Sequence, residues 1–123
     1  MGSYFENFKK GYLDMILLKI LSVNDCYGYE FTQLFSEITN NVFVFSPAAM
    51  YPALYRLEEK GFIECYEKNI SKRMKRKYYH LTGRGKEALQ EMYNDYNKVI
   101  KATNAILMYG NSCSSTLDVG NGE

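Results

Sequence analysis

The sequence predicts a mainly α-helical fold with one small β-hairpin and a long helix after it. Three observations lead to this prediction. Apolar residues recur at helical spacing before residue 60. Two strand-like runs flank a very basic segment between residues 62 and 81. Beyond residue 82, apolar residues follow spacings of 3 and 4, and a chain of 123 residues suits one domain with such a helix attached.

The first forty residues predict two helices. The first is expected over Ser3–Ser22, with Gly11 separating a short leading turn from a main helix that starts near Tyr12. A second helix is expected from Tyr27 to Asn40, after the turn signal Asn24–Asp25. The apolar residues at helical intervals are Phe5, Phe8, Tyr12, Ile16 and Ile20 in the first helix, and Phe31, Leu34, Phe35 and Ile38 in the second.

A third helix is predicted between Ser46 and Lys60. Ser46 is a good N-cap, proline suits the first helical position at Pro47, and Gly61 is expected to end the helix. Pro52 removes one intrahelical hydrogen bond, so distortion of the first turns is expected. The residues expected to face the core are Met50, Leu54 and Leu57.

A β-hairpin is predicted next, with strands over Phe62–Asn69 and Lys77–Leu81 and a basic tip over Ile70–Arg76. The net charge is only +1, but eight basic residues and no acidic one lie between Lys68 and Lys86. The rest of the chain therefore carries seven basic and 14 acidic residues. The distribution of charge, unlike its total, favours nucleic acid as a partner.

The last helix is predicted to start after a Thr82 cap and to run for about 26 residues, a rod of roughly 39 Å. A domain of 80 residues cannot cover such a rod, so a second copy of the chain is the expected partner and the protein a homodimer. We therefore expect a DNA-binding domain over 1–81, a dimerisation helix over 82–109 and a disordered tail over 110–123. The predicted dimerisation residues are Leu89, Met92, Tyr96, Val99, Ile100, Thr103 and Ile106.

Several classes of protein are not expected. The most apolar run, Leu13–Leu21, is short and contains two charged residues, so no membrane span is predicted. The three cysteines are widely spaced and form no CxxC motif, which favours a reduced cytoplasm and argues against a metal or disulfide site. No nucleophile–base pair, phosphate-cradling glycine loop or carboxylate pair appears, so neither a cofactor nor an enzyme is expected.

Helix, helix, helix, hairpin and long helix is the order of a winged helix-turn-helix protein. Its third helix would enter the major groove of double-stranded DNA, and its basic hairpin would reach the flanking backbone. For Tyr27, a core position and a backbone contact both remain open. The candidate DNA-binding residues are Ser46, Ala48, Ala49 and Tyr51 on the third helix, Lys72, Arg73, Lys75, Arg76 and Lys77 on the hairpin, and Tyr27.

The chain resembles the PadR family of bacterial transcriptional regulators between about Phe8 and Gln90. The motifs that carry the resemblance are Gly11-Tyr12-Leu13, Tyr27-Gly28-Tyr29-Glu30, Tyr51-Pro52-Ala53-Leu54-Tyr55-Arg56-Leu57-Glu58 with Gly61, Lys77-Tyr78-Tyr79, and Leu81-Thr82 with Gly85. The resemblance implies a homodimeric repressor that binds a pseudo-palindromic operator and is released by a small molecule. The single C-terminal helix places the chain in the short branch of the family.

Two departures from the family pattern stand out. Ala48 and Ala49 occupy positions where the family commonly has Gly followed by Ser or Thr, and an alanine donates no hydroxyl hydrogen bond. The chain also lacks tryptophan, so a small aromatic or hydrophobic effector would have to stack on Tyr93 and Tyr96 instead. The alternative function is a winged-helix module that binds protein without specific DNA binding.

Overall fold

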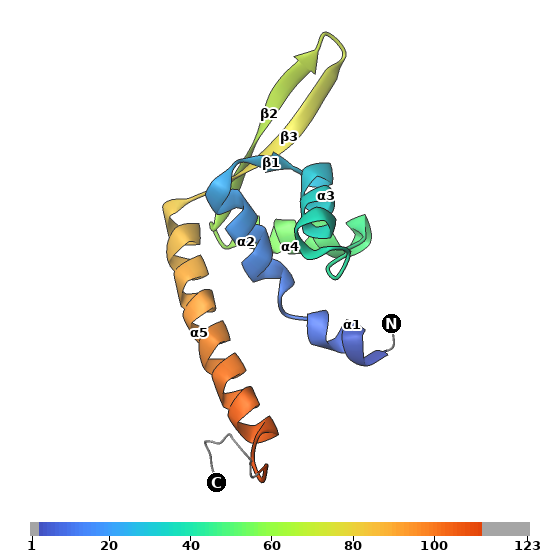
Figure 1. Cartoon of the computed structure of the whole chain (residues 1–123). Coiled ribbons are helices and arrows are strands. Elements are labelled where there is room, and N and C mark those ends of the chain that lie inside the picture. Colours follow the sequence, from blue (N-terminus) through green and yellow to red (C-terminus); the bar gives the residue numbers. More distant parts are fainter. Residues whose placement is uncertain (1–2, 112–123) are drawn as a thin grey trace. The chain divides into compact units, whose positions relative to one another are not determined.

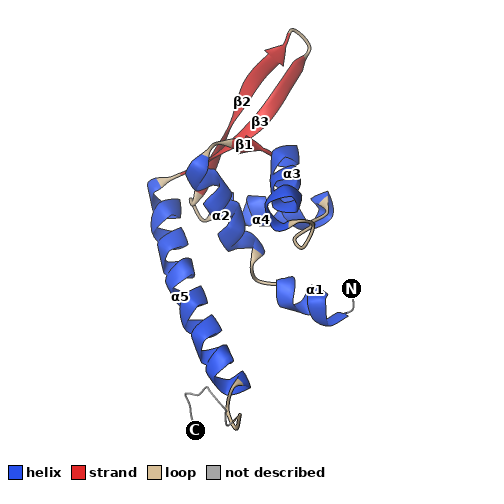
Figure 2. Ribbon diagram, viewed as in Figure 1, coloured by secondary structure: helices blue, strands red, loops and turns tan. Residues whose placement is uncertain are grey.

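The computed structural model describes residues 3–111 as five helices and three strands (Figures 1 and 2). In chain order these are α1 Ser3–Lys9, α2 Leu13–Val23, β1 Cys26–Tyr27, α3 Gly28–Thr39, α4 Pro47–Glu59, β2 Ile63–Ser71, β3 Met74–Leu81 and α5 Gly83–Leu107. The predicted mainly α-helical winged helix-turn-helix is confirmed. Most of the predicted tail, residues 112–123, lies outside the described residues.

The chain divides into two compact units within α5: the first ends at Gln90 and the second begins at Glu91. The first unit holds the core, to which α2, α3, α4 and the sheet all contribute. No helix within residues 3–111 is long and apolar enough to cross a membrane. The buried hydrophobic residues are Leu17, Leu18, Leu21, Cys26, Phe31, Phe35, Met50, Ala53, Leu54, Leu57, Ile63, Tyr79 and Leu81.

The first two predicted helices are present, but the sequence pattern selected partly wrong faces. Gly11, with a φ of 86°, ends α1 as expected, because this left-handed conformation suits glycine. In α2 the buried residues are Leu17, Leu18 and Leu21, whereas Phe8 on α1 is 74% exposed. Ile38 on α3 is 66% exposed because it lies near the end of the helix, past the packed turns around Phe31 and Phe35.

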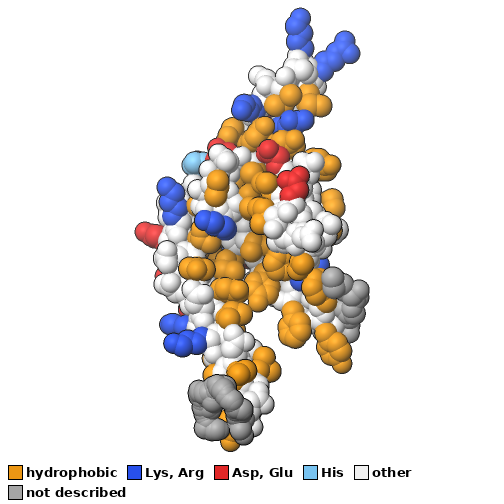
Figure 3. Space-filling view, viewed as in Figure 1, with side chains coloured by type: hydrophobic (Ala, Val, Ile, Leu, Met, Phe, Trp, Pro, Cys, Tyr) orange, Lys and Arg blue, Asp and Glu red, His pale blue; other side chains and the backbone are white. Residues whose placement is uncertain are grey.

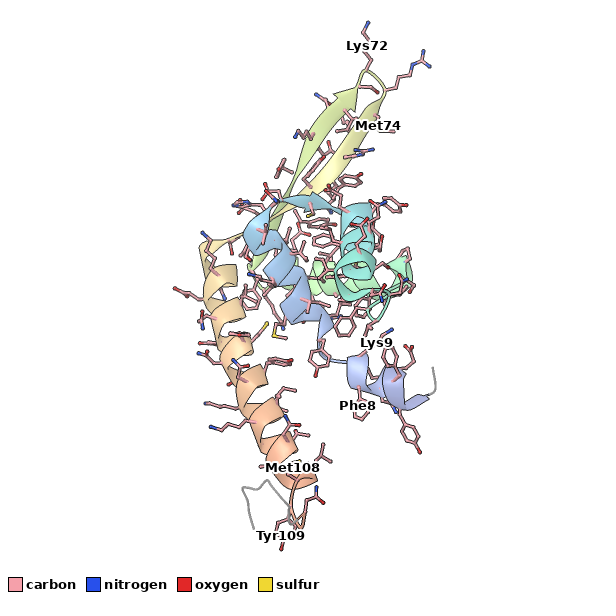
Figure 4. The ribbon with its side chains drawn as sticks, viewed as in Figure 1. Phe8, Lys9, Lys72, Met74, Met108 and Tyr109 are labelled. Atoms are coloured by element: carbon pink, nitrogen blue, oxygen red, sulfur yellow. The ribbon has the colours of Figure 1, made fainter. Side chains whose placement is uncertain are left out.

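The connection between α3 and α4 is apolar because it packs against the helices. The Phe45 ring lies 5.6 Å from the Phe35 ring and 5.9 Å from the Phe43 ring, between ring centroids. The Nζ atom of Lys9 lies 5.4 Å from the Phe45 ring centroid and donates a hydrogen bond to the Val44 carbonyl. This residue, labelled in Figure 4, ties α1 to the connection.

The hairpin differs from the prediction in its length and in its neighbour. Its strands extend to Ser71 and from Met74, so the turn contains only Lys72 and Arg73. The short strand β1 includes Tyr27, which is the predicted start of the second helix. This strand pairs antiparallel with β3, and the strand order is β1-β3-β2. Propensity did not predict β1 because two residues carry too little pattern to distinguish a strand from a helix start.

The turn of the hairpin is accommodated by a bulge. Neither Lys72 nor Arg73 has a positive φ, so the two-residue turn is not of a type that matches the twist of the flanking strands. The register shifts between Asn69 and Ser71, which leaves Ile70 as the extra residue. Such a bulge increases the local twist and lets the strands meet at this turn.

The start of α5 packs closely on the end of the hairpin. The Thr82 hydroxyl accepts a hydrogen bond from the Gly85 N–H at 3.0 Å, which confirms the predicted cap. A Cβ atom at Gly85 would lie 2.0 Å from the Phe62 carbonyl oxygen, so only glycine fits at this position. The first turn of α5 is therefore fixed to the first unit through backbone contact.

Candidate nucleic-acid interface

Helix α4 has one buried face and one exposed face. Met50, Ala53, Leu54 and Leu57 are at most 1% exposed and hold the helix on the core. Ser46 caps the helix by accepting a hydrogen bond from the Ala49 N–H at 3.2 Å, as predicted. The helix is continuous through Pro52, which lies on its exposed side.

The predicted DNA-binding residues of α4 all lie on its exposed side. Ser46, Ala48 and Ala49 are exposed at the start of the helix, and Tyr51 is 47% exposed. Tyr55, one turn further on and 62% exposed, extends this face, although the sequence prediction had not included it. An aromatic residue repeated at a spacing of four on the exposed side was the signal that could have identified it.

The basic residues of the hairpin are divided between its turn and β3. Lys72 and Arg73 form the turn, whereas Lys75 and Arg76 belong to β3, which corrects the predicted tip; Lys77 lies in this strand as predicted. Figure 3 shows positively charged side chains at the far end of the hairpin, and Figure 4 shows Lys72 pointing away from the rest of the first unit. Such a placement lets the charges reach phosphate groups.

A row of tyrosines crosses the outer face of the sheet. Tyr78 lies 5.5 Å from Tyr27 and 5.8 Å from Tyr66, measured between ring centroids, and the three residues are in register across the strands. The Arg76 guanidinium lies 4.3 Å from the Tyr27 ring centroid, and the Lys68 ammonium lies 5.2 Å from that of Tyr78. Each such contact contributes about 0.5–1 kcal/mol and stiffens the hairpin beyond the core.

A carboxylate between α2 and β1 joins both long strands. Tyr66 donates a hydrogen bond to Asp25 at 2.8 Å, and His80 Nδ1 lies 2.8 Å from the other carboxylate oxygen. Burial by itself would raise the pKa of Asp25, but the hydrogen bonds from His80 and Tyr66, together with the nearby charges of His80 and Lys68, lower it. The sequence predicts no partner for His80, whereas the structure pairs it with Asp25, 55 positions earlier in the chain.

The two described cysteines are free thiols, and both are held protonated at neutral pH. Burial, assisted by the charges of Glu30 and Asp25, raises the pKa of Cys26 to about 11. Cys65 donates a hydrogen bond to Glu58 at 3.0 Å, which raises its pKa together with partial burial. Neither thiol is poised to act as a thiolate nucleophile.

The predicted dimerisation residues lie on one uninterrupted helix, α5. Val99, Ile106 and Leu107 are 62%, 74% and 70% exposed, so the described chain leaves this part of the apolar stripe uncovered. Tyr93 and Tyr96 are brought together, with their rings nearly parallel and their centroids 6.4 Å apart.

Comparisons with known proteins agree on one family. Residues 17–91 match the family model described as the transcriptional regulator PadR-like family. A protein from Lysinibacillus sphaericus is 41% identical over 90 residues, which cover 73% of this chain and 83% of that one. The transcriptional regulator YqjI of Escherichia coli is 33% identical over 84 residues, 68% of this chain but only 39% of that protein.

A solved structure extends the similarity to the fold. The crystal structure of a PadR family transcription regulator from Clostridium difficile has 36% sequence identity and a TM-score of 0.68. The similarity covers 79% of this chain and 99% of the other.

Proposed function

Because the chain belongs to the PadR-like family of transcriptional regulators, we propose that it is a homodimeric repressor that binds a pseudo-palindromic operator. The observation that carries the proposal is the pairing of an exposed α4 face with a hairpin that concentrates five basic residues between Lys72 and Lys77. In this proposal α4 reads the major groove, and the hairpin, called the wing from here on, contacts the adjacent backbone. The action would take place in the cytoplasm.

The test is binding of labelled duplexes from the promoter region of the protein's own gene, measured by fluorescence anisotropy at about 0.15 M salt. The proposal expects one duplex to bind at least about a thousandfold more tightly than a scrambled duplex of equal length and composition. Equal, weak binding to both duplexes would contradict it.

Dimerisation through α5 is the second part of the proposal. Two α4 helices would then lie about 34 Å apart, one turn of DNA, as a two-fold operator requires. The double variant Val99→Asp, Ile100→Asp is expected to be monomeric by light scattering and to lose tight operator binding, because it places charges on the a/d seam at Val99 and beside it at Ile100, and these oppose burial of the stripe. The variant Lys98→Gln, at an exposed position of α5, is the matched control and should stay dimeric.

The third part of the proposal is relief of repression by a small aromatic or hydrophobic molecule that contacts Tyr93 and Tyr96. The paired rings offer a flat apolar surface for stacking. An effector should lower operator affinity in the wild type but not in the variant Tyr93→Ser, which keeps the predicted dimerisation residue Tyr96, as measured by the same anisotropy assay.

A protein-binding module without specific DNA binding is the competing function. It is favoured by Ala48 and Ala49, whose exposed side chains offer no hydrogen bond to a base or phosphate. Charge reversal at the wing turn, Lys72→Glu with Arg73→Glu, separates the two. Regulation of the target promoter in a reporter strain is lost if DNA binding is the function and retained if the wing charges are dispensable.

A further inference from the structure

A cleft of about 280 Å³ lies where three elements of the first unit meet. The start of α3, the exposed side of α4 and the basic half of β3 form its walls. Three of the lining residues are basic, four are tyrosines and none is acidic. They are Tyr27, Gly28, Tyr29, Tyr51, Lys75, Arg76, Lys77 and Tyr79.

The wall between α3 and α4 depends on the absence of a side chain at Gly28. A Cβ atom at this position would lie 2.1 Å from the Tyr51 hydroxyl oxygen and 2.8 Å from the ring carbon that bears it. The phenol of α4 therefore lies directly against the backbone of α3, and any larger residue would displace it.

The charge of the cleft comes from three consecutive residues of β3. Lys75 is 65% exposed at its side chain and lies 3.9 Å from Glu67, a distance at which the pair is weak. The Lys77 ammonium lies 5.5 Å from the centroid of the buried Tyr79 ring. Tyr79 is the main cause of a raised pKa of Lys77, so Lys77 is charged at neutral pH. Glu67 lies near Lys75 and the charge of Glu58 acts on Lys77, so two carboxylates lie near the three basic residues of the cleft, which keeps an excess of positive charge.

The backbone N–H of Tyr27, at the start of α3, is not a donor for a ligand in this cleft. Glu30 reaches back to accept a hydrogen bond from the Tyr27 N–H at 3.0 Å, so that backbone donor is already used. The donors that line the cleft are side chains: the Lys75 and Lys77 ammonium groups and the Tyr51 hydroxyl. Each ammonium group has three N–H donors, so Lys77 can bind a ligand besides its hydrogen bonds with Tyr79 and Cys65. A cleft with two ammonium groups, one hydroxyl and no carboxylate in its lining suits a single phosphate group.

We propose that this cleft holds one backbone phosphate of bound DNA, with Lys75, Lys77 and Tyr51 as its ligands and Gly28 as the residue that positions Tyr51. The inference rests on the proposed function, since it assumes that the wing and α4 lie on DNA. It adds a second backbone contact at the base of the wing, separate from that of the turn at Lys72 and Arg73.

The test uses operator duplexes in which one phosphate at a time is replaced by a neutral methylphosphonate. One position in each half-site should weaken wild-type binding by about tenfold, as expected for a lost charge-assisted hydrogen bond. In the variant Tyr51→Phe, Lys75→Gln this position should cost less than about twofold, while the other positions keep their cost. The variant Lys72→Gln is the matched control and should abolish the cost at a different position.

The role of Gly28 is tested by a double-mutant cycle. Gly28→Ala should weaken operator binding by about tenfold in the wild type, because the displaced hydroxyl loses its phosphate, and should cost nothing further in a Tyr51→Ala background. Additive losses would show that Gly28 does not act through Tyr51. Thermal unfolding of each variant by circular dichroism shows whether a loss reflects folding instead, and the methylphosphonate series decides the proposal without Gly28→Ala.

The outcomes separate this inference from the proposed function. If a specific duplex binds but the methylphosphonate costs are the same in wild type and variant, the inference fails and the proposed function stands. If no duplex binds specifically, both fail. If inorganic phosphate titrated alone saturates the cleft residues by NMR and the duplex does not displace it, the cleft serves a free phosphorylated molecule and the inference is overturned.

Discussion

Helix α4 and the wing lie in the same compact unit but are stabilised in different ways. Four residues of α4 are almost completely buried against α2 and the sheet, so the position of this helix is set by the core. Between the Cys65–Tyr79 pair and the turn of the wing, no residue of either strand is buried. The strands are held there by their hydrogen bonds, a row of tyrosines and cation–π contacts. Figure 2 shows the wing extending past the helices.

The comparison indicates that core packing sets the position of α4, whereas exposed side chains provide the charge of the wing. Substitutions on the buried face of α4 should change the stability of the whole first unit, because a cavity there removes packing that many residues share. Substitutions of the turn charges Lys72 and Arg73 should change DNA affinity with little effect on stability, because these two side chains are exposed to water. Four variants, taken from the largest expected effect to the smallest, test this separation.

Leu54→Ala should have the largest effect. Leu54 is 1% exposed, so its truncation should lower the free energy of unfolding by about 2–5 kcal/mol, measured by urea denaturation. Tyr55→Ala, on the exposed side of the same turn, is the control and should change stability by less than about 1 kcal/mol. Equal losses for the two variants would break the distinction between the faces of α4.

Lys72→Gln with Arg73→Gln should leave stability unchanged and weaken operator binding. Two lost phosphate contacts correspond to about 2 kcal/mol, or roughly a 30-fold rise in Kd, and should reduce the slope of log K against log salt by about 2. The measurement is anisotropy between 0.05 and 0.3 M salt, values chosen around the physiological range. Lys98→Gln with Lys101→Gln removes the same charge from α5 and should leave the slope as it is.

Tyr78→Ala should loosen the wing without loosening α4. Removing the central ring ends two ring contacts and the contact with Lys68, a loss of about 1.5 kcal/mol when each contact is taken at the low end of its range. Amide hydrogen exchange should become faster in β2 and β3 between Tyr66 and Arg76 and stay unchanged in α4. Faster exchange in both elements would mean that the wing is not independent of the core.

Asp25→Asn should have the smallest effect and should be visible in the pH dependence. Because the folded-state pKa of Asp25 is lowered, the carboxylate stabilises the fold above its unfolded pKa of about 3.9 and loses that contribution as the pH falls through the folded value. The variant should therefore be less stable at pH 7 by under about 1 kcal/mol, and the gap in Tm should close once the pH falls below the lowered folded-state pKa of Asp25. A gap that is the same at both pH values would show that the charge of Asp25 is not the cause.

The sequence predicted the helices and the wing well because their signals are local. Ser46, Pro47 and Gly61 define α4 through capping and backbone preferences that act within a few residues. The alternation of the last strand and the basic run likewise predicted a hairpin. The exact extent of the strands was not predictable, because Lys75 and Arg76 have no strong strand preference and enter β3 through pairing with β2.

The candidate site was predicted less completely because it depends on contacts between distant residues. The pairing of Asp25 with His80 and the approach of Tyr51 to Gly28 join segments 55 and 23 positions apart in the chain. The fuller burial of Leu17 and Leu18 than of Ile16 and Ile20 depends in the same way on which side of α2 meets α4. Periodicity shows that a helix has an apolar stripe but leaves its partner undefined.

The two-residue turn of the wing has a practical consequence for following the protein in solution. Lys72 and Arg73 are adjacent, exposed and far from the core, which makes this peptide segment the preferred cleavage site for a trypsin-like protease. Cleavage after Lys72 would cut the chain of 123 residues into fragments of 72 and 51 residues, which mass spectrometry resolves easily. Bound DNA would shield the segment, so the rate of cleavage would report occupancy of the protein without any label.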